Sequence, residues 1–336
     1  MADIQLLDED LFTRILIDPI KRGSNELFIL SGYASASMVT RHFDQIRKIT
    51  GEKISLDLIV GMTGRDGIDR SNLLGFQAIP RQTSGNTFNC AFTTRGTSDH
   101  SKIFVWCNEE GPVEAYLGSS NYTQFGFGIG NLAGRHKEVC VEVNPQLAFD
   151  KVLAAAKGTI GYLNQDIPSY VDIFDRPENN APLGTSDSEQ SQESSTVLLP
   201  LVQTRAGLFG KPHEKAGLNW GQREGREPNQ AYIPVPSKVA RLGFFPEKGV
   251  HFQIHTDDGE VFLATIAQEN DKAIETPSNN SLLGKYFRKR LGLELGVFVD
   301  AEDLLRYGAN AVRVRKKDEL VYELEFRPGI LVQDQP

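Results

Sequence analysis

Cysteine is scarce in this 336-residue sequence, and its three copies form no recognisable pair. Cys90, Cys107 and Cys140 lie far apart, and no C-x-x-C spacing occurs. An odd number of scattered cysteines argues against a disulfide framework and against a zinc site. We therefore expect reduced thiols, no bound metal and a cytoplasmic protein.

Long apolar segments and nucleotide-binding loops are also missing. No apolar run approaches the ~20 residues that span a bilayer. The first residues, MADIQLLDEDLF, are acidic and lack the apolar segment of a signal peptide. No G-x-x-x-x-G-K-S/T motif occurs, so any use of ATP would belong to a separate partner protein.

The net charge of −8 is unevenly distributed along the chain. Residues 1–175 hold 16 Lys and Arg against 21 Asp and Glu, whereas residues 197–336 hold 19 of each. The stretch 176–196 has one basic and four acidic residues. Because nucleic acids are bound by local basic patches, an acidic total does not exclude DNA binding.

Residues 176–196 mark the clearest boundary in the chain. Their sequence, RPENNAPLGTSDSEQSQESST, has almost no large apolar side chain and cannot bury enough surface to fold. We predict a flexible acidic linker there. It would separate a domain at residues 1–175 from a second domain at residues 197–336.

The two predicted domains differ in their patterns. In the first, apolar runs at 26–30 and 54–60 alternate with helical patterns at 37–49 and 147–163, which predicts an α/β fold. In the second, short strand-like runs are separated by turn residues, at 231–235, 250–255, 261–267, 296–299, 311–314 and 320–326. Such spacing predicts a mainly-β, barrel-like domain.

The tripeptide His100-Ser101-Lys102 is the best candidate for chemistry. It precedes an apolar run, 103–106, and the whole segment is typical of a strand. Strand side chains alternate between faces, so His100 and Lys102 would point the same way. The imidazole can act as a nucleophile or carry protons, and the ammonium can neutralise phosphoryl oxygens. The alternative is a surface strand that carries H-x-K by coincidence.

Two downstream segments add to this pattern. Gly118-Ser119-Ser120-Asn121 follows the strand-like run 113–117, and its small residues allow close approach to an anion. Glu138 opens another strand-like run, 138–143, and a carboxylate can hold an imidazole in one tautomer. Alone, the first segment would be an ordinary turn and the second a solvated strand face.

Together these residues resemble the signature of the phospholipase D superfamily, which they match in the order His100, Lys102, Ser119, Asn121 and Glu138. The superfamily's longer pattern has an aspartate where this sequence has Cys107, and that departure fits the nuclease branch better than the lipid hydrolases. The segments 29–35, 56–61 and 218–236 are similar to NgoFVII-type restriction endonucleases. That family joins an α/β phospholipase D-like nuclease domain to a mainly-β B3-like (pseudobarrel) DNA-binding domain.

The resemblance implies a mechanism that needs no metal or other cofactor. His100 would attack phosphorus and form a phosphohistidine, and a second histidine would protonate the leaving oxygen and then activate water. Lys102, Asn121 and Ser119 would hold the phosphate oxygens, while Glu138 orients His100. The first predicted domain has one H-x-K, and the other, His213-Glu214-Lys215, lies in the second domain, so we expect a homodimer in which two copies of His100 meet.

Two basic segments of the second domain are candidates for reading DNA. Residues 205–241 hold seven basic and three acidic side chains, and residues 281–291 hold four basic ones and no acid. The resemblance implies two arms that grip the major groove. The candidate contacts are Lys211, Asn219, Trp220, Gln222, Arg223, Arg226, Gln230, Lys285, Tyr286, Arg288, Lys289 and Arg290. The alternative for the first segment is a solvated loop beside a structural tryptophan.

We predict a site-specific endonuclease that cuts double-stranded DNA as a homodimer, a type II restriction enzyme of the bacterial cytoplasm. The resemblance also implies a cognate methyltransferase and, for some relatives, a separate ATP-dependent partner. Two alternatives remain. One is another phosphodiesterase of the superfamily, such as a non-specific nuclease or a lipid hydrolase, and the other is a DNA-binding regulator that kept the fold without the activity.

Overall fold

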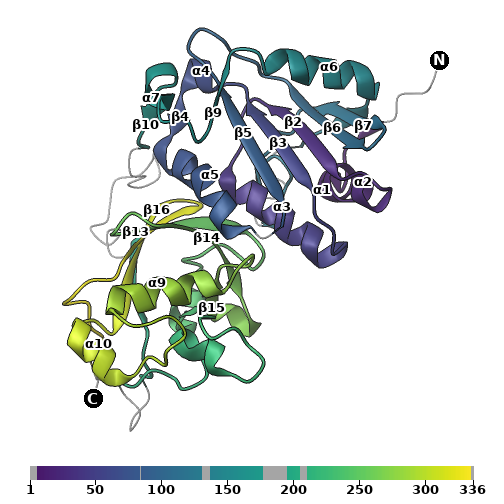
Figure 1. Ribbon diagram of the computed structural model, residues 1–336. Helices are drawn as coiled ribbons and strands as arrows, with labels where there is room; N and C mark the ends of the chain where they lie inside the picture. Colours follow the sequence, from purple (N-terminus) through teal and green to yellow (C-terminus); the bar gives the residue numbers. More distant parts are fainter. Residues whose placement is uncertain (1–5, 84, 131–136, 177–194, 205–209, 334–336) are drawn as a thin grey trace, which may run out of the picture. The chain divides into compact units, whose positions relative to one another are not determined.

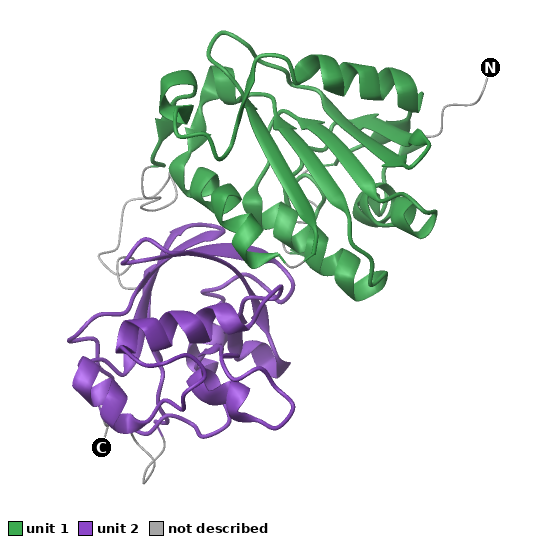
Figure 2. Cartoon of the chain, in the orientation of Figure 1, with its two compact units in different colours: residues 1–176 green, residues 177–336 purple. Residues whose placement is uncertain are grey.

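The computed structural model describes residues 6–83, 85–130, 137–176, 195–204 and 210–333. Contacts divide the chain into two compact units, residues 1–176 and 177–336 (Figure 2). Most of the predicted linker, residues 177–194, lies outside the described residues, and each unit is described by itself. No helix in the described ranges is long and apolar enough to cross a membrane.

Unit 1 is built on a mixed sheet with the strand order β1-β8-β7-β6-β2-β3-β5-β9 (Figure 1). Strands β2, β3 and β5 run parallel, and β6 lies antiparallel beside β2. The central strands are nearly continuous apolar runs, as expected of strands covered on both faces. The strands of unit 1 are β1 (Leu6–Leu7), β2 (Glu26–Ser31), β3 (Ser55–Val60), β4 (Ile68–Asp69), β5 (Thr87–Thr93), β6 (Lys102–Asn108), β7 (Gly111–Gly118), β8 (Cys140–Glu142), β9 (Thr159–Gly161) and β10 (Ile173–Phe174).

Helices cover both faces of this sheet (Figure 1). Helix α6 packs on one face, where Ala148 and Val152 share a core cluster with Ile103. On the opposite face, the Trp106 indole nitrogen donates to Ile15 O of helix α1 at 2.7 Å. The helices are α1 (Leu11–Leu16), α2 (Asp18–Lys21), α3 (Ala36–Ile49), α4 (Thr63–Asp66), α5 (Arg70–Gln82), α6 (Pro145–Ala155) and α7 (Ile167–Tyr170).

Unit 2 contains a curled sheet with the order β11-β16-β17-β13-β14-β15-β12 (Figure 1). Its neighbouring strands are antiparallel except β13 and β17, which run parallel. Phe252, Phe287 and Tyr322 belong to the core that this sheet encloses. The strands are β11 (Thr196–Pro200), β12 (Ile233–Pro234), β13 (His251–Thr256), β14 (Val261–Ala267), β15 (Ala273–Glu275), β16 (Ala311–Asp318) and β17 (Val321–Glu325).

Short helices close the core of unit 2. Helix α9 (Ser281–Leu291) buries Leu283, Phe287 and Leu291, which share one face because they are spaced at helical intervals. Helix α10 (Ala301–Tyr307) begins with a capping box between Asp300 and Asp303. The other helical elements are α8 (Ser237–Arg241), η3 (Gly217–Gln222) and η4 (Glu269–Asp271).

Two sequence predictions about elements were wrong. The pattern at 147–163 predicts one helix, but α6 ends at Ala155 and β9 begins at Thr159. Gly158 lies between them with a φ of +81°, which a helix cannot accommodate. The run 296–299 forms no strand, because the Asn219 side chain, rather than a neighbouring strand, binds both backbone groups of Val299.

Candidate active site and DNA-binding surface

The end of strand β2 brings the predicted catalytic segments of unit 1 together. Ser31 pairs with Lys102 across β2 and β6, and the following amide, Gly32 N, donates to Ser101 O at 3.1 Å. Strand β6 begins at Lys102, so His100 lies in the loop before the strand rather than within it. The alternation of side chains along a strand therefore explains where the Lys102 side chain points. It does not apply to His100, which precedes the strand.

Gly32 forms the floor of the candidate site. A Cβ atom placed on Gly32 would lie 2.8 Å from His100 Cδ2, 3.4 Å from Asn121 Oδ1 and 3.4 Å from Lys102 Nζ. His100 and Lys102 belong to one segment and Asn121 to another. Their side chains therefore meet beside the backbone of Gly32, which belongs to a third segment. The absence of a side chain at Gly32 lets the three side chains converge on the backbone, since a methyl group there would clash with His100.

Lys102 is held by the loop that precedes it. Its Nζ donates to His100 O at 2.6 Å, and only 6% of the residue is exposed. Burial lowers the pKa of the Lys102 amine, and the charges of Glu138 and Asp99 oppose that shift. A partly desolvated ammonium interacts more strongly with a phosphoryl group than one in bulk water does.

Ser119 and Glu138 meet beside the ends of β7 and β8. Ser119 Oγ donates to Glu138 Oε2 and accepts a hydrogen bond from Val139 N at 3.0 Å. Glu138 precedes β8 rather than opening it. In the described chain its carboxylate binds Ser119 and interacts electrostatically with Lys102, whereas the sequence analysis predicts a contact with His100.

Asp99 anchors the loop that carries His100. Its Oδ1 accepts from Ser101 N at 2.9 Å, and its Oδ2 accepts from Lys151 Nζ on α6 at 2.6 Å. Burial raises the pKa of Asp99, but the hydrogen bonds from Lys151 and Ser101 outweigh it and lower the pKa overall. The carboxylate is therefore charged near neutral pH and ties the loop to α6. The sequence analysis missed Asp99, although an acid directly before the histidine was visible in the chain.

His42 is the other histidine among the described residues of unit 1, and it lies in the core. Its Nε2 lies 2.8 Å from Leu16 O and its Nδ1 2.8 Å from Tyr122 Oη. Because a carbonyl only accepts, Nε2 carries the proton and Nδ1 accepts from the tyrosine. Burial lowers the pKa of His42 to about 4. This neutral, fully bonded imidazole cannot be the second catalytic histidine, and His136 lies outside the described residues.

In unit 2, the two segments predicted to be separate arms pack against each other. Glu227 accepts a hydrogen bond from Ser281 Oγ at the start of α9. Gln222 Nε2 donates to Gly296 O, beyond the end of α9, at 3.0 Å. The stretch 219–230 and helix α9 therefore form one continuous structure rather than two independent arms.

Asn219 and Arg288 are fully buried, with 0% of either residue exposed. Asn219 Oδ1 accepts from Val299 N at 2.9 Å, and its Nδ2 donates to Val299 O at 2.8 Å. Arg288 Nε donates to Val297 O at 2.7 Å. Their burial argues against the predicted contacts with DNA, because their polar groups hold the backbone that follows α9.

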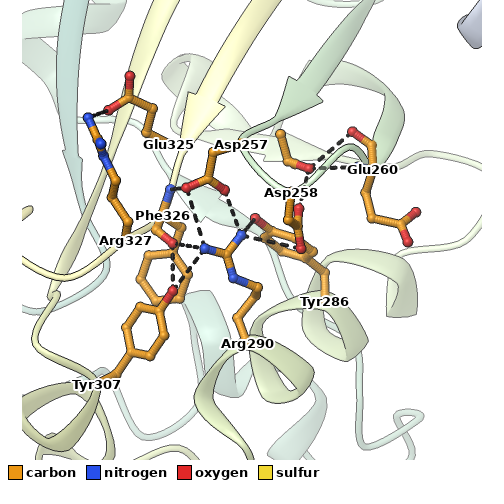
Figure 3. Close-up of polar contacts among 10 residues, drawn as sticks. Asp257, Asp258, Glu260, Tyr286, Arg290, Tyr307, Glu325, Phe326 and Arg327 are labelled. Atoms are coloured by element: carbon orange, nitrogen blue, oxygen red, sulfur yellow. Dashed lines mark hydrogen bonds and ion pairs between the residues drawn. The ribbon is translucent and has the colours of Figure 1, made fainter.

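Arg290 is the centre of a polar network inside unit 2 (Figure 3). Its Nη1 donates to Asp257 Oδ1 at 2.6 Å and to Tyr286 Oη at 2.9 Å, and its Nη2 donates to Tyr307 Oη at 2.9 Å. Burial lowers the pKa of Arg290, but the hydrogen bond to Asp257 and the other partners raise it overall. Arg290 and the buried Tyr286 are therefore engaged in a network within unit 2, and their contacts with DNA stay a prediction.

Apart from Trp220, which is buried, the other predicted DNA contacts lie at the surface of unit 2. The Arg226 guanidinium lies over the Trp220 ring, with Cζ 4.0 Å from its centroid, and its Nη1 donates to Gln230 Oε1 at 2.9 Å. Arg223 Nε donates to Lys215 O at 2.7 Å. Exposed or partly exposed polar groups are also provided by Lys211, Gln222, Lys285 and Lys289.

Two family models match the chain, one for each unit. The model of the NgoFVII restriction endonuclease N-terminal PLD domain matches residues 9–165. The model of the NgoFVII C-terminal B3-like DNA-binding domain matches residues 190–318. The chain belongs to the NgoFVII restriction endonuclease family. Unit 1 is therefore a phospholipase D-like domain and unit 2 a B3-like DNA-binding domain, as the sequence resemblance predicts.

The remaining comparisons add no argument. No curated protein matches this member of the NgoFVII family. Among solved structures, a polyphosphate kinase from Porphyromonas gingivalis matches 45% of the chain with 14% identity and a TM-score of 0.29. The chain covers 22% of that kinase, and a similarity of this size carries no functional argument.

For this NgoFVII-family protein, Gly32→Ala is expected to slow DNA cleavage by about 10²-fold, the effect of displacing a reacting group by about 1 Å. The new methyl group would lie 2.8 Å from His100 Cδ2 and would force the imidazole to move. Single-turnover cleavage rates at saturating enzyme measure the effect. Gly161→Ala in β9 is the matched control, because its Cβ would meet nothing within 4 Å. Equal rates for the two variants would contradict the crowded geometry.

Proposed function

We propose that this protein is a type II restriction enzyme, a site-specific endonuclease that cuts double-stranded DNA through His100. The observation that carries the proposal is the convergence of His100, Lys102 and Asn121 on the backbone of Gly32. Membership of the NgoFVII restriction endonuclease family supports it. The site combines a nucleophile, a fixed cation and an amide beside bare backbone, which suits a phosphodiester.

The proposed reaction needs no metal ion or other cofactor. The His100 imidazole attacks phosphorus, the bond from phosphorus to the leaving oxygen breaks, and a phosphohistidine forms. A second histidine gives its proton to the leaving oxygen and then takes one from the water that hydrolyses the phosphohistidine. Lys102 and Asn121 stabilise the negative charge that develops on the phosphoryl oxygens. Ser119, whose hydroxyl is bound to Glu138, extends this set of polar groups.

The second histidine is proposed to be His100 of a second copy of the chain. His42 is buried and both of its ring nitrogens are bonded, so it does not supply the acid. A two-fold axis next to the site would place one imidazole on either side of the phosphorus, and the dimer interface would be isologous. Two imidazoles this close would titrate as a coupled pair rather than independently.

Unit 2 is proposed to read the DNA sequence through its exposed polar groups. Arginine can bind guanine through two hydrogen bonds, and glutamine can bind adenine in the same way. Arg223, Arg226, Gln222 and Gln230 are the base-reading candidates. Trp220 would support Arg226 by stacking, and Lys211, Lys285 and Lys289 would contact phosphates.

The proposal is tested by incubating the purified chain with a library of duplex DNA in EDTA, alone and with any separate ATP-dependent partner protein. Sequencing the ends of the products would reveal the recognition sequence and the cut position. We expect cuts at one defined sequence in the presence of EDTA. A cleavage step that requires Mg²⁺, or cuts without sequence preference, would contradict the proposal.

Arg223→Ala is expected to weaken binding to the recognition sequence by about 1–3 kcal/mol, the contribution of one bidentate base contact. Arg223 is exposed, and its Nε donates to Lys215 O. Fluorescence anisotropy with specific and random duplexes at one salt concentration measures the change. Lys289→Ala is the comparison, because a lost phosphate contact weakens binding to both duplexes alike. Equal weakening on both duplexes by Arg223→Ala would assign Arg223 to the phosphates.

A further inference from the structure

Tyr33 is an exposed aromatic residue that is held rigidly beside the candidate site. It follows Gly32 directly, and 43% of its surface is exposed. Its hydroxyl donates to Asp66 Oδ2, at the end of α4, at 2.5 Å. The hydrogen bond to Asp66 is the main reason that the pKa of Tyr33 is raised, and burial adds to the shift. The hydrogen bond to Asp66 therefore fixes the far end of an exposed ring.

The Tyr33 ring packs edge-on against the His100 imidazole. The two ring centroids are 5.9 Å apart and the rings are inclined at 79°, which is a favourable arrangement for aromatic pairs. His100 is exposed, and within the described residues Glu138 binds Ser119 instead of the imidazole. The tyrosine ring on one side and Gly32 below are therefore the contacts that define where the imidazole lies.

The backbone of Tyr33 also binds a second site residue. Tyr33 N donates to Asn121 Oδ1 at 3.1 Å. Because a backbone N–H can only donate, this bond assigns the amide oxygen of Asn121 and leaves its Nδ2 group as the donor for a ligand. Ser31 Oγ strengthens the junction by donating to Tyr33 O at 2.7 Å and accepting from Tyr122 N at 2.9 Å.

We propose that Tyr33 is a positioning residue, which holds the His100 imidazole through its ring and the Asn121 amide through its backbone, with Asp66 as its anchor. The inference rests on the proposed function, since it assigns to Tyr33 the orientation of the proposed nucleophile. Only the ring contact depends on the side chain. Substitution of Tyr33 therefore tests the orientation of His100 while the backbone bond to Asn121 remains.

The first test is the single-turnover rate of DNA cleavage by Tyr33→Leu at saturating enzyme, together with the affinity for specific DNA. We expect the rate to fall by about 10²-fold, as for other displaced reacting groups, with affinity within about twofold of wild type. Tyr170→Leu is the matched control, because Tyr170 is a half-exposed tyrosine of the same unit. An unchanged rate, or a loss confined to affinity, would contradict a positioning role and make Tyr33 a DNA contact instead.

The anchor is tested by a double-mutant cycle on Tyr33 and Asp66. Tyr33→Phe keeps the ring and removes its hydrogen bond, and Asp66→Ala removes the other partner of the same bond. Each variant is expected to slow cleavage by about two- to tenfold, and the double variant should be no slower than either. Multiplicative losses would show that the two side chains act separately.

A third measurement does not depend on nuclease activity. Relaxation of ¹³C in the His100 imidazole of the full chain, assigned with His100→Ala, reports the mobility of the ring. We expect Tyr33→Leu to increase this mobility and Tyr170→Leu to leave it unchanged. If the wild-type chain did not cut DNA, the proposed function would fail, yet the relaxation data would still decide the role of Tyr33. An imidazole equally rigid in Tyr33→Leu would overturn the inference.

Discussion

Replacing His100 with alanine is expected to slow DNA cleavage at least about 10³-fold, because the substitution removes the atom that attacks phosphorus. Binding of specific DNA is expected to survive, since the residues proposed to read the sequence belong to unit 2. Cleavage of a duplex containing the recognition sequence in EDTA measures the first effect, and a mobility-shift titration measures the second.

Chemical rescue distinguishes loss of the nucleophile from structural damage to the site. His100→Gly leaves a space for added imidazole, which should restore part of the rate without changing DNA affinity. His100→Gln fills the space with a polar group that cannot form a phosphohistidine, and it should remain inactive in the presence of imidazole. Substantial cleavage by His100→Ala in EDTA would show that another residue attacks the phosphorus.

Arg290→Met is expected to destabilise unit 2 by about 3–5 kcal/mol, the effect of removing one partner from a buried ion pair. The Arg290 and Asp257 side chains are 16% and 19% exposed, and Asp257 would lose the cation that balances its charge. The Asp257 carboxylate also accepts from Phe326 N at 3.2 Å (Figure 3), so the segment after β17 would lose part of its support. Hydrogen exchange followed by mass spectrometry reports the stability of each unit separately.

Lys289→Met provides the control for this prediction. Lys289 is the adjacent residue on α9 and is exposed, so its loss should change stability by less than about 0.5 kcal/mol. Unit 1 should keep its protection in both variants. Equal stability of unit 2 in Arg290→Met and Lys289→Met would contradict the prediction. It would show that the network around Arg290 contributes little to stability and that Arg290 is available for the predicted DNA contact.

The candidate catalytic segments could be recognised in the sequence because their residues are close together in the chain. His100 and Lys102 are two positions apart, and Ser119 and Asn121 occupy one small-residue turn. Gly32 is a different case. Nothing local distinguishes it from other glycines, and its role emerges only when the pairing of β2 with β6 places it below His100 and Lys102.

The sequence could not separate buried from exposed DNA-binding candidates, because composition does not reveal which polar side chains fold inward. Asn219 binds a backbone group 80 residues away, and Arg290 meets an aspartate 33 residues away. Arg288, Lys289 and Arg290 are adjacent and chemically alike, yet only Lys289 faces solvent. The rotation of α9 decides this, since burial of Leu283, Phe287 and Leu291 turns Arg288 toward the backbone carbonyls.

The most direct test of the proposed mechanism is the chemical identity of the reaction intermediate. A reaction in EDTA is quenched within one turnover, digested and analysed by mass spectrometry under conditions that preserve phosphoramidate bonds. The account predicts a nucleotide attached through phosphorus to His100 and absent from His100→Ala. An adduct on another residue, or cleavage that proceeds with no adduct and only with added Mg²⁺, would contradict it.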